Sequence, residues 1–299
     1  MPLVRRARRL LDRLERVLGQ VELVLRAFVS EPPGAEEFAR HWAFRWQASL
    51  GGGRLVPIPE PALFDLDSLI GVDTSVAALD RNTRQLMAGL PCNDVLLHGE
   101  RGTGKSSAVR GLLGRYGRAG LRVVEVDRAD LVHLPTILDA LRGGKGLHFI
   151  LFCDDLSFAP GESGHRELKA ALEGNLTGRP PNTCIVATSN RRHLVPETMA
   201  ENRMARVDDQ GELHLGEALE EKLALADRFG LVLGFYNFNQ NVYLAIVTSY
   251  LAKAGVPELD EMTRRDALRF ALERGSRSGR TARQFVDDAV GRLRLDERR

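Results

Sequence analysis

The stretch VLLHGERGTGKSSAVRGLL, residues 95–113, constrains this 299-residue chain more than any other feature. An apolar run typical of a buried strand ends at Gly99, and after a glycine-rich turn Lys105 and Ser106 open a segment of helical periodicity. The spacing of Gly99, Gly104, Lys105 and Ser106 fits G-x-x-x-x-G-K-[ST], in which backbone N–H groups converge on phosphate oxygens at a helix N-terminus. We therefore expect a strand, a phosphate-binding turn and a helix in that order. Lys105 would reach the β- and γ-phosphates, and the Ser106 hydroxyl would ligate Mg²⁺.

Two further apolar runs end in polar residues that suit phosphate chemistry. HFILFCDD ends in Asp154, which we assign to the Mg²⁺ shell, and Asp155, which we assign to orienting or deprotonating the attacking water. The alternative is that Asp155 caps the segment that follows. CIVATSN ends in Asn190, whose amide is expected to position water or to sense the γ-phosphate.

Strand and helix patterns alternate through the middle of the chain. DVLLHG, LRVVEVD, LHFILFCDD and TCIVATSN are predicted strands, and residues 133–142 and 163–176 are predicted helices. Continuous apolar strands alternating with helices indicate an α/β fold with a parallel sheet covered on both faces. Three helices are predicted after residue 236, in NQNVYLAIVTSYLAKAG, TRRDALRFALERG and TARQFVDDAVGRLRL.

The N-terminal part has a different pattern. Residues 3–29 have the apolar spacing of an amphipathic helix, and residues 1–30 hold seven arginines against three acidic residues. A second short helix carrying Trp42, Phe44 and Trp46 is predicted next, and SLGGGRLVPIPEPALFDL has the composition of a linker. We therefore divide the chain into an N-terminal helical region with its linker (1–55), an α/β nucleotide-binding core (56–235) and a helical lid (236–299).

The composition indicates the compartment in which the protein works, but it does not indicate what the protein binds. Hydrophobic content of 43%, charged content of 27% and a net charge of +2 are ordinary for a globular protein. Cys92, Cys153 and Cys184 are widely spaced and form no CxxC pair, and the last two lie in apolar runs, so we expect buried, reduced thiols. No apolar run approaches the roughly 20 residues that a membrane span needs, so we expect a cytoplasmic protein with no membrane partner.

Taken together, the motifs resemble those of the AAA+ ATPase superfamily. The resemblance rests on the Walker A motif at 99–106, the Walker B motif at 149–155, the asparagine-bearing strand at 184–190, EEKLALADRFGL at 220–231 and GSRSGRTARQF at 275–285. More narrowly, ERGTGKSS, FILFCDDLSF, ATSNRRHLVPE and LADRFGLVLGFY are similar to a bacterial family of AAA+ ATP-binding proteins of unassigned cellular role.

The resemblance implies a three-layer P-loop core with a five-stranded parallel sheet, a C-terminal helical lid and an N-terminal helical extension. It implies that ATP lies against Ile70, Gly71, Gly99, Glu100, Arg101, Gly102, Thr103, Gly104, Lys105, Ser106 and Ser107. DRFGL is similar to a motif of the Holliday-junction branch-migration motor whose arginine acts in trans, which makes Arg228 the matching residue. SGRTA resembles the sensor 2 motif, which places Arg280 over the γ-phosphate.

Two functions remain open at this stage. The first is a Mg²⁺-dependent ATPase in a ring homo-oligomer, usually of six subunits in this superfamily, that acts on an unknown protein or DNA client. The second is an ATP-gated binding switch that hydrolyses slowly or not at all. Most motors of this type have glutamate where this chain has Asp155, and the shorter side chain favours the switch. A small-molecule kinase would have no use for Arg228, Arg280 or a helical lid.

Overall fold

The structure is a computed structural model that describes residues 33–49, 52–156, 164–173, 179–190, 206–207, 213–214, 225–256 and 259–296. The amphipathic helix predicted over residues 3–29 lies outside this set. Within it, no helix combines the length and the apolar character that crossing a membrane requires.

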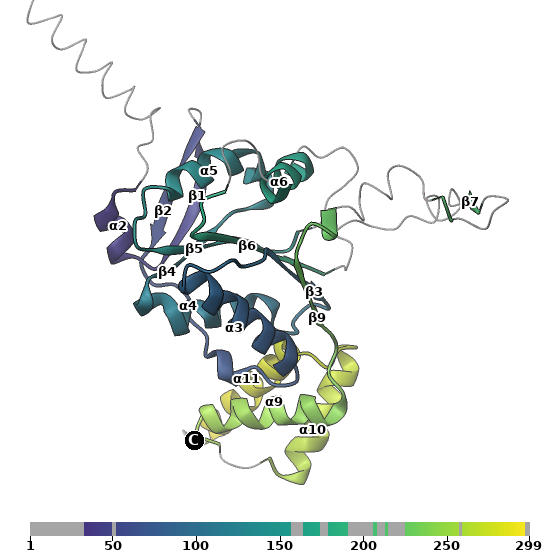
Figure 1. The fold of residues 1–299 in the computed structure, drawn as a ribbon. Helices are drawn as coiled ribbons and strands as arrows, with labels where there is room; N and C mark the ends of the chain where they lie inside the picture. The colour runs from purple at the N-terminus through teal and green to yellow at the C-terminus, as the bar shows by residue number, and fades with distance from the viewer. Residues whose placement is uncertain are drawn as a thin grey trace, which may run out of the picture.

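A seven-stranded sheet in the order β2-β1-β4-β5-β6-β3-β9 forms the centre of the fold (Figure 1). The strands are β1 (Ala43–Ser49), β2 (Gly52–Ile58), β3 (Val95–Gly99), β4 (Leu121–Glu125), β5 (His148–Cys153), β6 (Thr183–Ser189) and β9 (Leu231–Phe235). All neighbouring pairs are parallel except β1 with β2. The α/β class and the four predicted strands are confirmed. β9 is a fifth strand of the core, and β1 and β2 extend the sheet beyond the five strands expected.

Helices cover both faces of the sheet. α3 (Asp73–Met87) and α4 (Lys105–Tyr116) pack on one face, and α5 (Leu134–Leu141) and α6 (Gly164–Glu173) pack on the other (Figure 1). The helices predicted at 133–142 and 163–176 are therefore confirmed, as is the end of α4 at Gly117. The shorter segments are α2 (Ala35–Arg40), the 3₁₀ turns η1 (Leu66–Ser68), η2 (Gly117–Ala119) and η3 (Arg128–His133), and a separate antiparallel pair, β7 (Arg206–Val207) with β8 (Leu213–His214).

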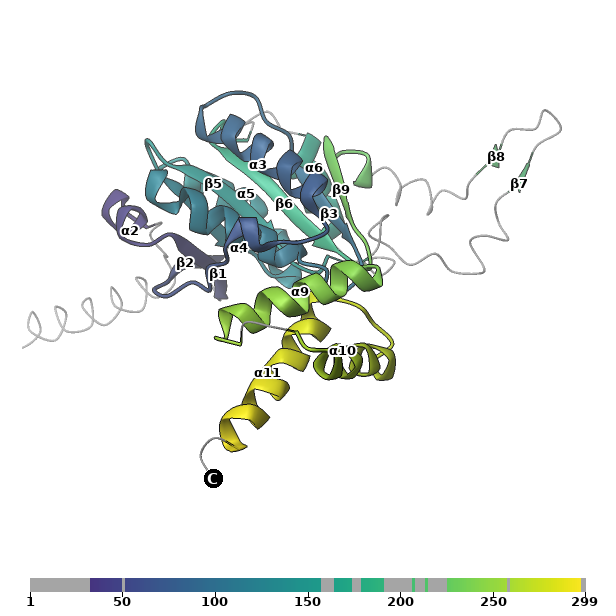
Figure 2. The same cartoon turned by 90° about the horizontal axis from the view of Figure 1, so that it is seen from below.

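The three predicted C-terminal helices form a lid beside the sheet (Figure 2). They are α9 (Gln240–Lys253), α10 (Glu261–Glu273) and α11 (Gly279–Asp296). Side-chain caps fix where two of them begin, because Asn239 accepts from the Val242 N–H at 2.9 Å and Asp260 accepts from the Thr263 N–H at 2.7 Å. One apolar core joins α3, α4 and the lid to the sheet, and a second lies under α5 and α6.

The predictions for residues 41–58 are wrong. The segment with Phe44 and Trp46 is strand β1, and the glycine-rich segment after it is strand β2, so the boundary set near residue 55 falls inside the sheet. The physical reason is steric: a Cβ on Gly53 would lie 2.4 Å from the Trp46 ring. The glycine therefore makes room for a buried indole across the hairpin, and Pro57 is tolerated because β2 is an edge strand.

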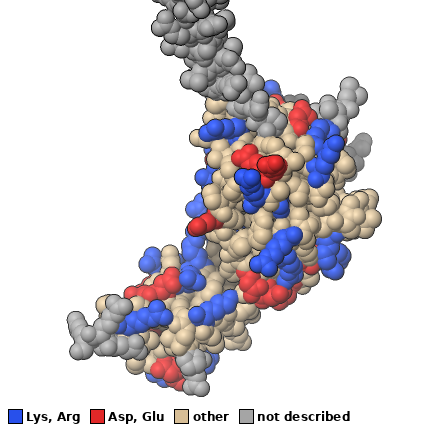
Figure 3. All heavy atoms as spheres, turned by 90° about the vertical axis from the view of Figure 1, so that its left-hand side faces the viewer, with Lys and Arg blue, Asp and Glu red and all other residues tan. Residues whose placement is uncertain are grey.

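Charges of both signs are interspersed on the surface. Figure 3 shows Lys and Arg side chains beside Asp and Glu side chains over both the core and the lid. Among the described residues, the face drawn there carries mixed charge rather than a field of one sign.

Candidate phosphate-binding site

The loop between β3 and α4 can adopt its shape only because it contains glycines. Gly99, Gly102 and Gly104 have φ values of 136°, 78° and 105°, which L-residues with side chains rarely adopt. A Cβ at Gly99 would lie 1.8 Å from the carbonyl oxygen of Phe235. The loop ends at α4, whose first residue is Lys105 and whose start has no side-chain cap. The first N–H groups of the helix are therefore available to a ligand bound in the loop. Such a helix start favours an anion.

Lys105 is drawn inward from the start of α4. Its side-chain nitrogen donates to the carbonyl oxygens of Gly99 and Glu100, both at 2.7 Å, and to Oδ1 of Asn190 at 3.2 Å. Burial lowers the pKa of the Lys105 ammonium, and the nearby carboxylates of Asp155 and Asp154 oppose that shift. The ammonium thus lies within a group of oxygen acceptors at the mouth of the loop.

A cluster of oxygen ligands lies beside Lys105. The Ser106 hydroxyl donates to Asp154 Oδ1 at 2.8 Å, and the Thr188 hydroxyl donates to the same oxygen at 2.5 Å. Hydroxyl and carboxylate oxygens are the ligands that Mg²⁺ prefers, together with water and phosphate. The donor set of Ser106 and Asp154 therefore fits a magnesium ion, provided that the ion takes the place of the hydrogen bond between them.

Asp155 is held in an unusual backbone conformation. Its φ is 51°, and among the described residues it is the one non-glycine residue with positive φ. Its N–H donates to the Thr188 hydroxyl at 2.8 Å, and its Oδ1 accepts from the Asn190 amide at 2.5 Å. Arg101 lies 3.9 Å from the other oxygen, and 61% of the Asp155 side chain is exposed. The carboxylate is thus held at the cleft surface, where water can reach it.

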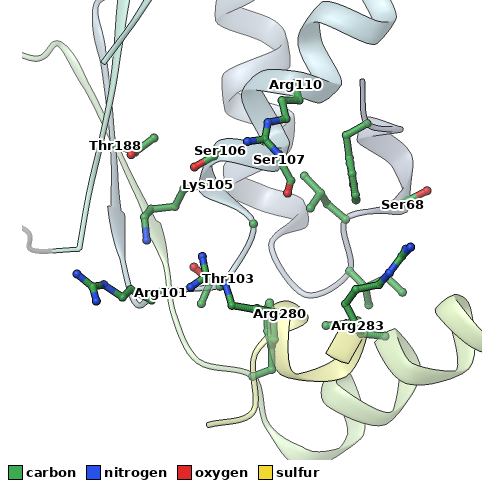
Figure 4. A pocket seen from close by; sticks show the side chains of 18 of the residues that line it. Ser68, Arg101, Thr103, Lys105, Ser106, Ser107, Arg110, Thr188, Arg280 and Arg283 are labelled. Atoms are coloured by element: carbon green, nitrogen blue, oxygen red, sulfur yellow. The ribbon is translucent and has the colours of Figure 1, made fainter. Parts of the chain in front are cut away.

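A cleft of about 700 Å³ connects the loop to the lid. Figure 4 shows Lys105 and Ser106 on one wall, with Arg280 and Arg283 entering from α11. The main chain also joins the two parts, because the Arg280 N–H donates to the carbonyl oxygen of Gly102 at 3.3 Å. The lining also includes the apolar or aromatic side chains of Phe64, Leu69, Ile70, Phe238, Ile246 and Tyr250. A lining that combines cations with apolar side chains suits a ligand that carries both phosphates and a ring.

Most of the residues predicted for the site come together. Those that line the cleft are Ile70, Arg101, Gly102, Thr103, Gly104, Lys105, Ser106, Ser107, Asp154, Asp155, Asn190 and Arg280. Gly99 and Glu100 lie behind Lys105 and present carbonyl oxygens to it. A Cβ on Gly71, whose φ is 82°, would meet Val242 of α9 at 2.5 Å, so this glycine serves the contact between core and lid.

Arg228 does not line the cleft. Its guanidinium pairs with Glu173 at the end of α6, with Nε at 2.6 Å from Oε1, and 22% of its side chain is exposed. Of the residues predicted for the site, Gly71, Gly99, Glu100 and Arg228 are therefore not among those that line the cleft.

Sequence reasoning missed some of the lining. Arg110 and Arg283 both face the cleft. Helical spacing could have found them, because Arg110 is four residues after Ser106 on α4 and Arg283 is three residues after Arg280 on α11. No local sequence pattern predicts that Phe64 and Ser68 line the cleft. Both lie in the segment before α3.

The strand order, the phosphate loop and the helical lid define an AAA+ P-loop fold. Three solved structures of Thermotoga maritima RuvB share it: the Holliday junction branch migration motor at 17% identity, and two single-residue variants of the same protein at 18% and 17%. Each has a TM-score of 0.52, with 78% of this chain and 66% of the RuvB chain covered, so the match spans just under two thirds of RuvB. No curated protein matches the chain.

The chain belongs to the family described as "Protein of unknown function (DUF815)", which matches residues 39–293. The family match begins before β1, and so it includes both strands of the hairpin that the sequence analysis had placed outside the core.

Proposed function

We propose that this protein binds ATP together with Mg²⁺ and hydrolyses it, and that it uses the nucleotide state to move the lid relative to the core. The observation that carries the proposal is the meeting of Ser106 and Asp154, 2.8 Å apart at the open end of the glycine loop. A hydroxyl from the start of α4 and a carboxylate from the end of β5 form the divalent-ion half of a nucleoside triphosphate site.

In this proposal different residues bind the phosphates, the Mg²⁺ ion and the base of ATP. The loop N–H groups and Lys105 hold the β- and γ-phosphates, and Lys105 exchanges its carbonyl contacts for phosphate oxygens. Ser106 and Asp154 hold Mg²⁺, which when bound would neutralise charge on the phosphates. The apolar side chains of the lining, Ile70 among them, receive the base.

Asp155 and Asn190 act on the attacking water. The Asp155 carboxylate accepts a proton or a hydrogen bond from the water, while Asn190 fixes the carboxylate from the neighbouring strand. Their 2.5 Å hydrogen bond supports this assignment, since it fixes the carboxylate while 61% of the Asp155 side chain stays exposed to water.

Arg280 couples the nucleotide to the lid. Its side chain enters the cleft from α11, and its backbone N–H is bonded to Gly102 of the phosphate loop. A γ-phosphate bound to this guanidinium would draw the lid toward the core, and loss of that phosphate would release it.

Arg228 acts on a neighbouring subunit in a ring. In support, it lies outside the cleft of its own chain, and its partner Glu173 is 47% exposed, so the pair is open to solvent. An arginine that reaches the transferring phosphoryl group stabilises its spread charge, which makes hydrolysis depend on assembly. The client of such a ring is a protein or DNA.

Asp155 favours a second candidate, an ATP-gated binding switch with little turnover. Its side chain is one methylene shorter than glutamate, and both of its oxygens already have protein partners. A switch of this kind closes on ATP and recruits its partner in that state.

ATP turnover per chain, measured against protein concentration in the presence of Mg²⁺, separates the two. The assembled ATPase predicts turnover that rises steeply with concentration. Tight ATP binding with negligible turnover at every concentration identifies the switch, and failure to bind ATP at all overturns both.

A further inference from the structure

Two of the three cysteines lie near each other at the N-terminal ends of β3 and β6, the end of these strands away from the phosphate loop. Cys92 lies just before β3, and Cys184 is the second residue of β6. Because β3 and β6 are parallel neighbours with Val95 beside Val186, the register puts Cys184 next to the residue that follows Cys92. An interaction between the two thiols shifts their pKa values in opposite directions. Their separation in sequence hides this interaction completely.

The two thiols have unequal surroundings. Cys92 is partly exposed, whereas Cys184 is 2% exposed. The Cys184 sulfur lies 3.1 Å from the backbone oxygen of Asn93, an acceptor for its proton. The interaction with Cys184 lowers the pKa of Cys92 to about 7, and the Arg179 guanidinium adds to this against burial and the Asp94 carboxylate. The same interaction and burial raise the pKa of Cys184.

We propose that Cys92 and Cys184 form a dithiol that a small-molecule disulfide oxidises to an internal disulfide, with Cys92 as the attacking thiol and Cys184 as the resolving thiol. The position of the two residues across the neighbouring strands β3 and β6, the access to Cys92 from solvent and the burial of Cys184 carry this assignment. The proposal is independent of the proposed function, because it concerns the opposite edge of the sheet.

The reaction proceeds in two exchanges. The Cys92 thiolate attacks one sulfur of the small disulfide, which forms a mixed disulfide and releases one small thiolate. The Cys184 thiolate then attacks the Cys92 sulfur, which forms the internal bond and releases the second small thiolate. The two protein thiols lose two electrons to the small disulfide, and their two protons go to the released thiolates.

Cys153 provides an internal control. Its side chain is fully buried in β5, the middle strand of the sheet. A thiol of this kind is inert toward exchange in the folded protein. Oxidation that follows the geometry must therefore leave Cys153 unmodified.

The test is to incubate the folded full-length chain with oxidised glutathione, block free thiols with an alkylating agent and measure the intact mass before and after proteolysis. We expect a chain that has lost two hydrogens, a linked peptide pair containing Cys92 and Cys184, and alkylated Cys153. Three alkylated cysteines, or a lasting glutathione adduct on Cys92 of the unaltered chain, would overturn the proposal.

Two variants separate the roles of the thiols. In Cys184→Ala the adduct on Cys92 should persist, because the resolving thiol is gone. In Cys92→Ser, a mild change at a partly exposed site, Cys184 should remain free. Modification of Cys184 at the normal rate in Cys92→Ser contradicts the order of attack, and this variant stays informative even where Cys184→Ala folds poorly.

Discussion

Thr188 donates its hydroxyl hydrogen to Asp154 at 2.5 Å, and this bond joins the end of β6 to the end of β5. The same hydroxyl accepts the Asp155 N–H at 2.8 Å, so one side chain fixes both acids of the site. A threonine that touches neither phosphate nor metal in our proposal thus positions the residues that do.

Replacing Thr188 tests this positioning role. Thr188→Val keeps the shape of the side chain but removes both hydrogen bonds. We therefore expect the affinity for Mg²⁺ to fall by about 10- to 100-fold, measured as a Mg²⁺ titration of ATP turnover or ATP binding. Thr188→Ser retains the hydroxyl and should stay close to the parent protein. Equal Mg²⁺ affinity in the two variants would contradict the positioning role of the Thr188 hydroxyl.

Lys105→Ala should abolish ATP binding, because the loop loses the charge that meets the phosphates. Binding of a fluorescent ATP analogue to the folded variant measures this directly. Lys145→Ala is the matched control, since Lys145 is exposed in the turn before β5, at the edge of the sheet away from the cleft. Retention of micromolar affinity in Lys105→Ala contradicts the assignment of phosphate to this loop.

Asp155→Asn should bind ATP normally but hydrolyse it about 10²- to 10⁴-fold more slowly, because the amide cannot accept the proton from water. Asp155→Glu extends the carboxylate by one methylene. If the short side chain limits turnover, this variant should be faster than the parent protein in a phosphate-release assay. Unchanged turnover in Asp155→Asn would move the water-activating role to another residue.

Arg228→Ala should bind ATP but lose most of its hydrolysis, and mixing it with Lys105→Ala should restore part of the activity. The rescue arises because, in mixed rings, an intact Arg228 from one variant faces an intact loop from the other. Glu173→Gln removes the same ion pair while leaving Arg228 in place, and it therefore controls for local structure. No rescue on mixing argues against action between subunits.

Gly53→Ala should destabilise the fold by about 1–3 kcal/mol in urea unfolding, because the added methyl group meets the buried Trp46 ring. Gly52→Ala is the control, since Gly52 also has positive φ but no atom within 4 Å of the added carbon. The difference between the two variants isolates the contact with Trp46. Equal losses would mean that backbone strain alone accounts for the effect.

Local patterns predicted the parts of the site that are local in sequence. The spacing from Gly99 to Ser106 determines a strand, a turn and a helix within a few residues, and Asp154 and Asn190 follow strands that are buried along almost their whole length. Because parallel strands end at one edge of a sheet, these separate motifs were expected to meet, and all of them line or adjoin one cleft.

The errors arise where packing between distant residues decides the structure. In the sequence Gly53 belongs to a glycine-rich stretch that is typical of a linker. In the structure the Trp46 ring fills the space where a Gly53 side chain would lie. Helix α3, which the sequence analysis did not predict, begins at Asp73 without a side-chain cap. Cys92 and Cys184 become neighbours only through the register of β3 with β6.

The phosphate loop and the lid share a short mechanical connection. Gly99 lies directly against Phe235, the last residue of β9, and the Glu100 N–H bonds to the Phe235 oxygen at 3.1 Å. Only residues 236–239 separate that strand from α9. So few residues leave little slack, and if ATP fills the loop as we propose, a shift of the loop is passed on to the first lid helix rather than absorbed on the way.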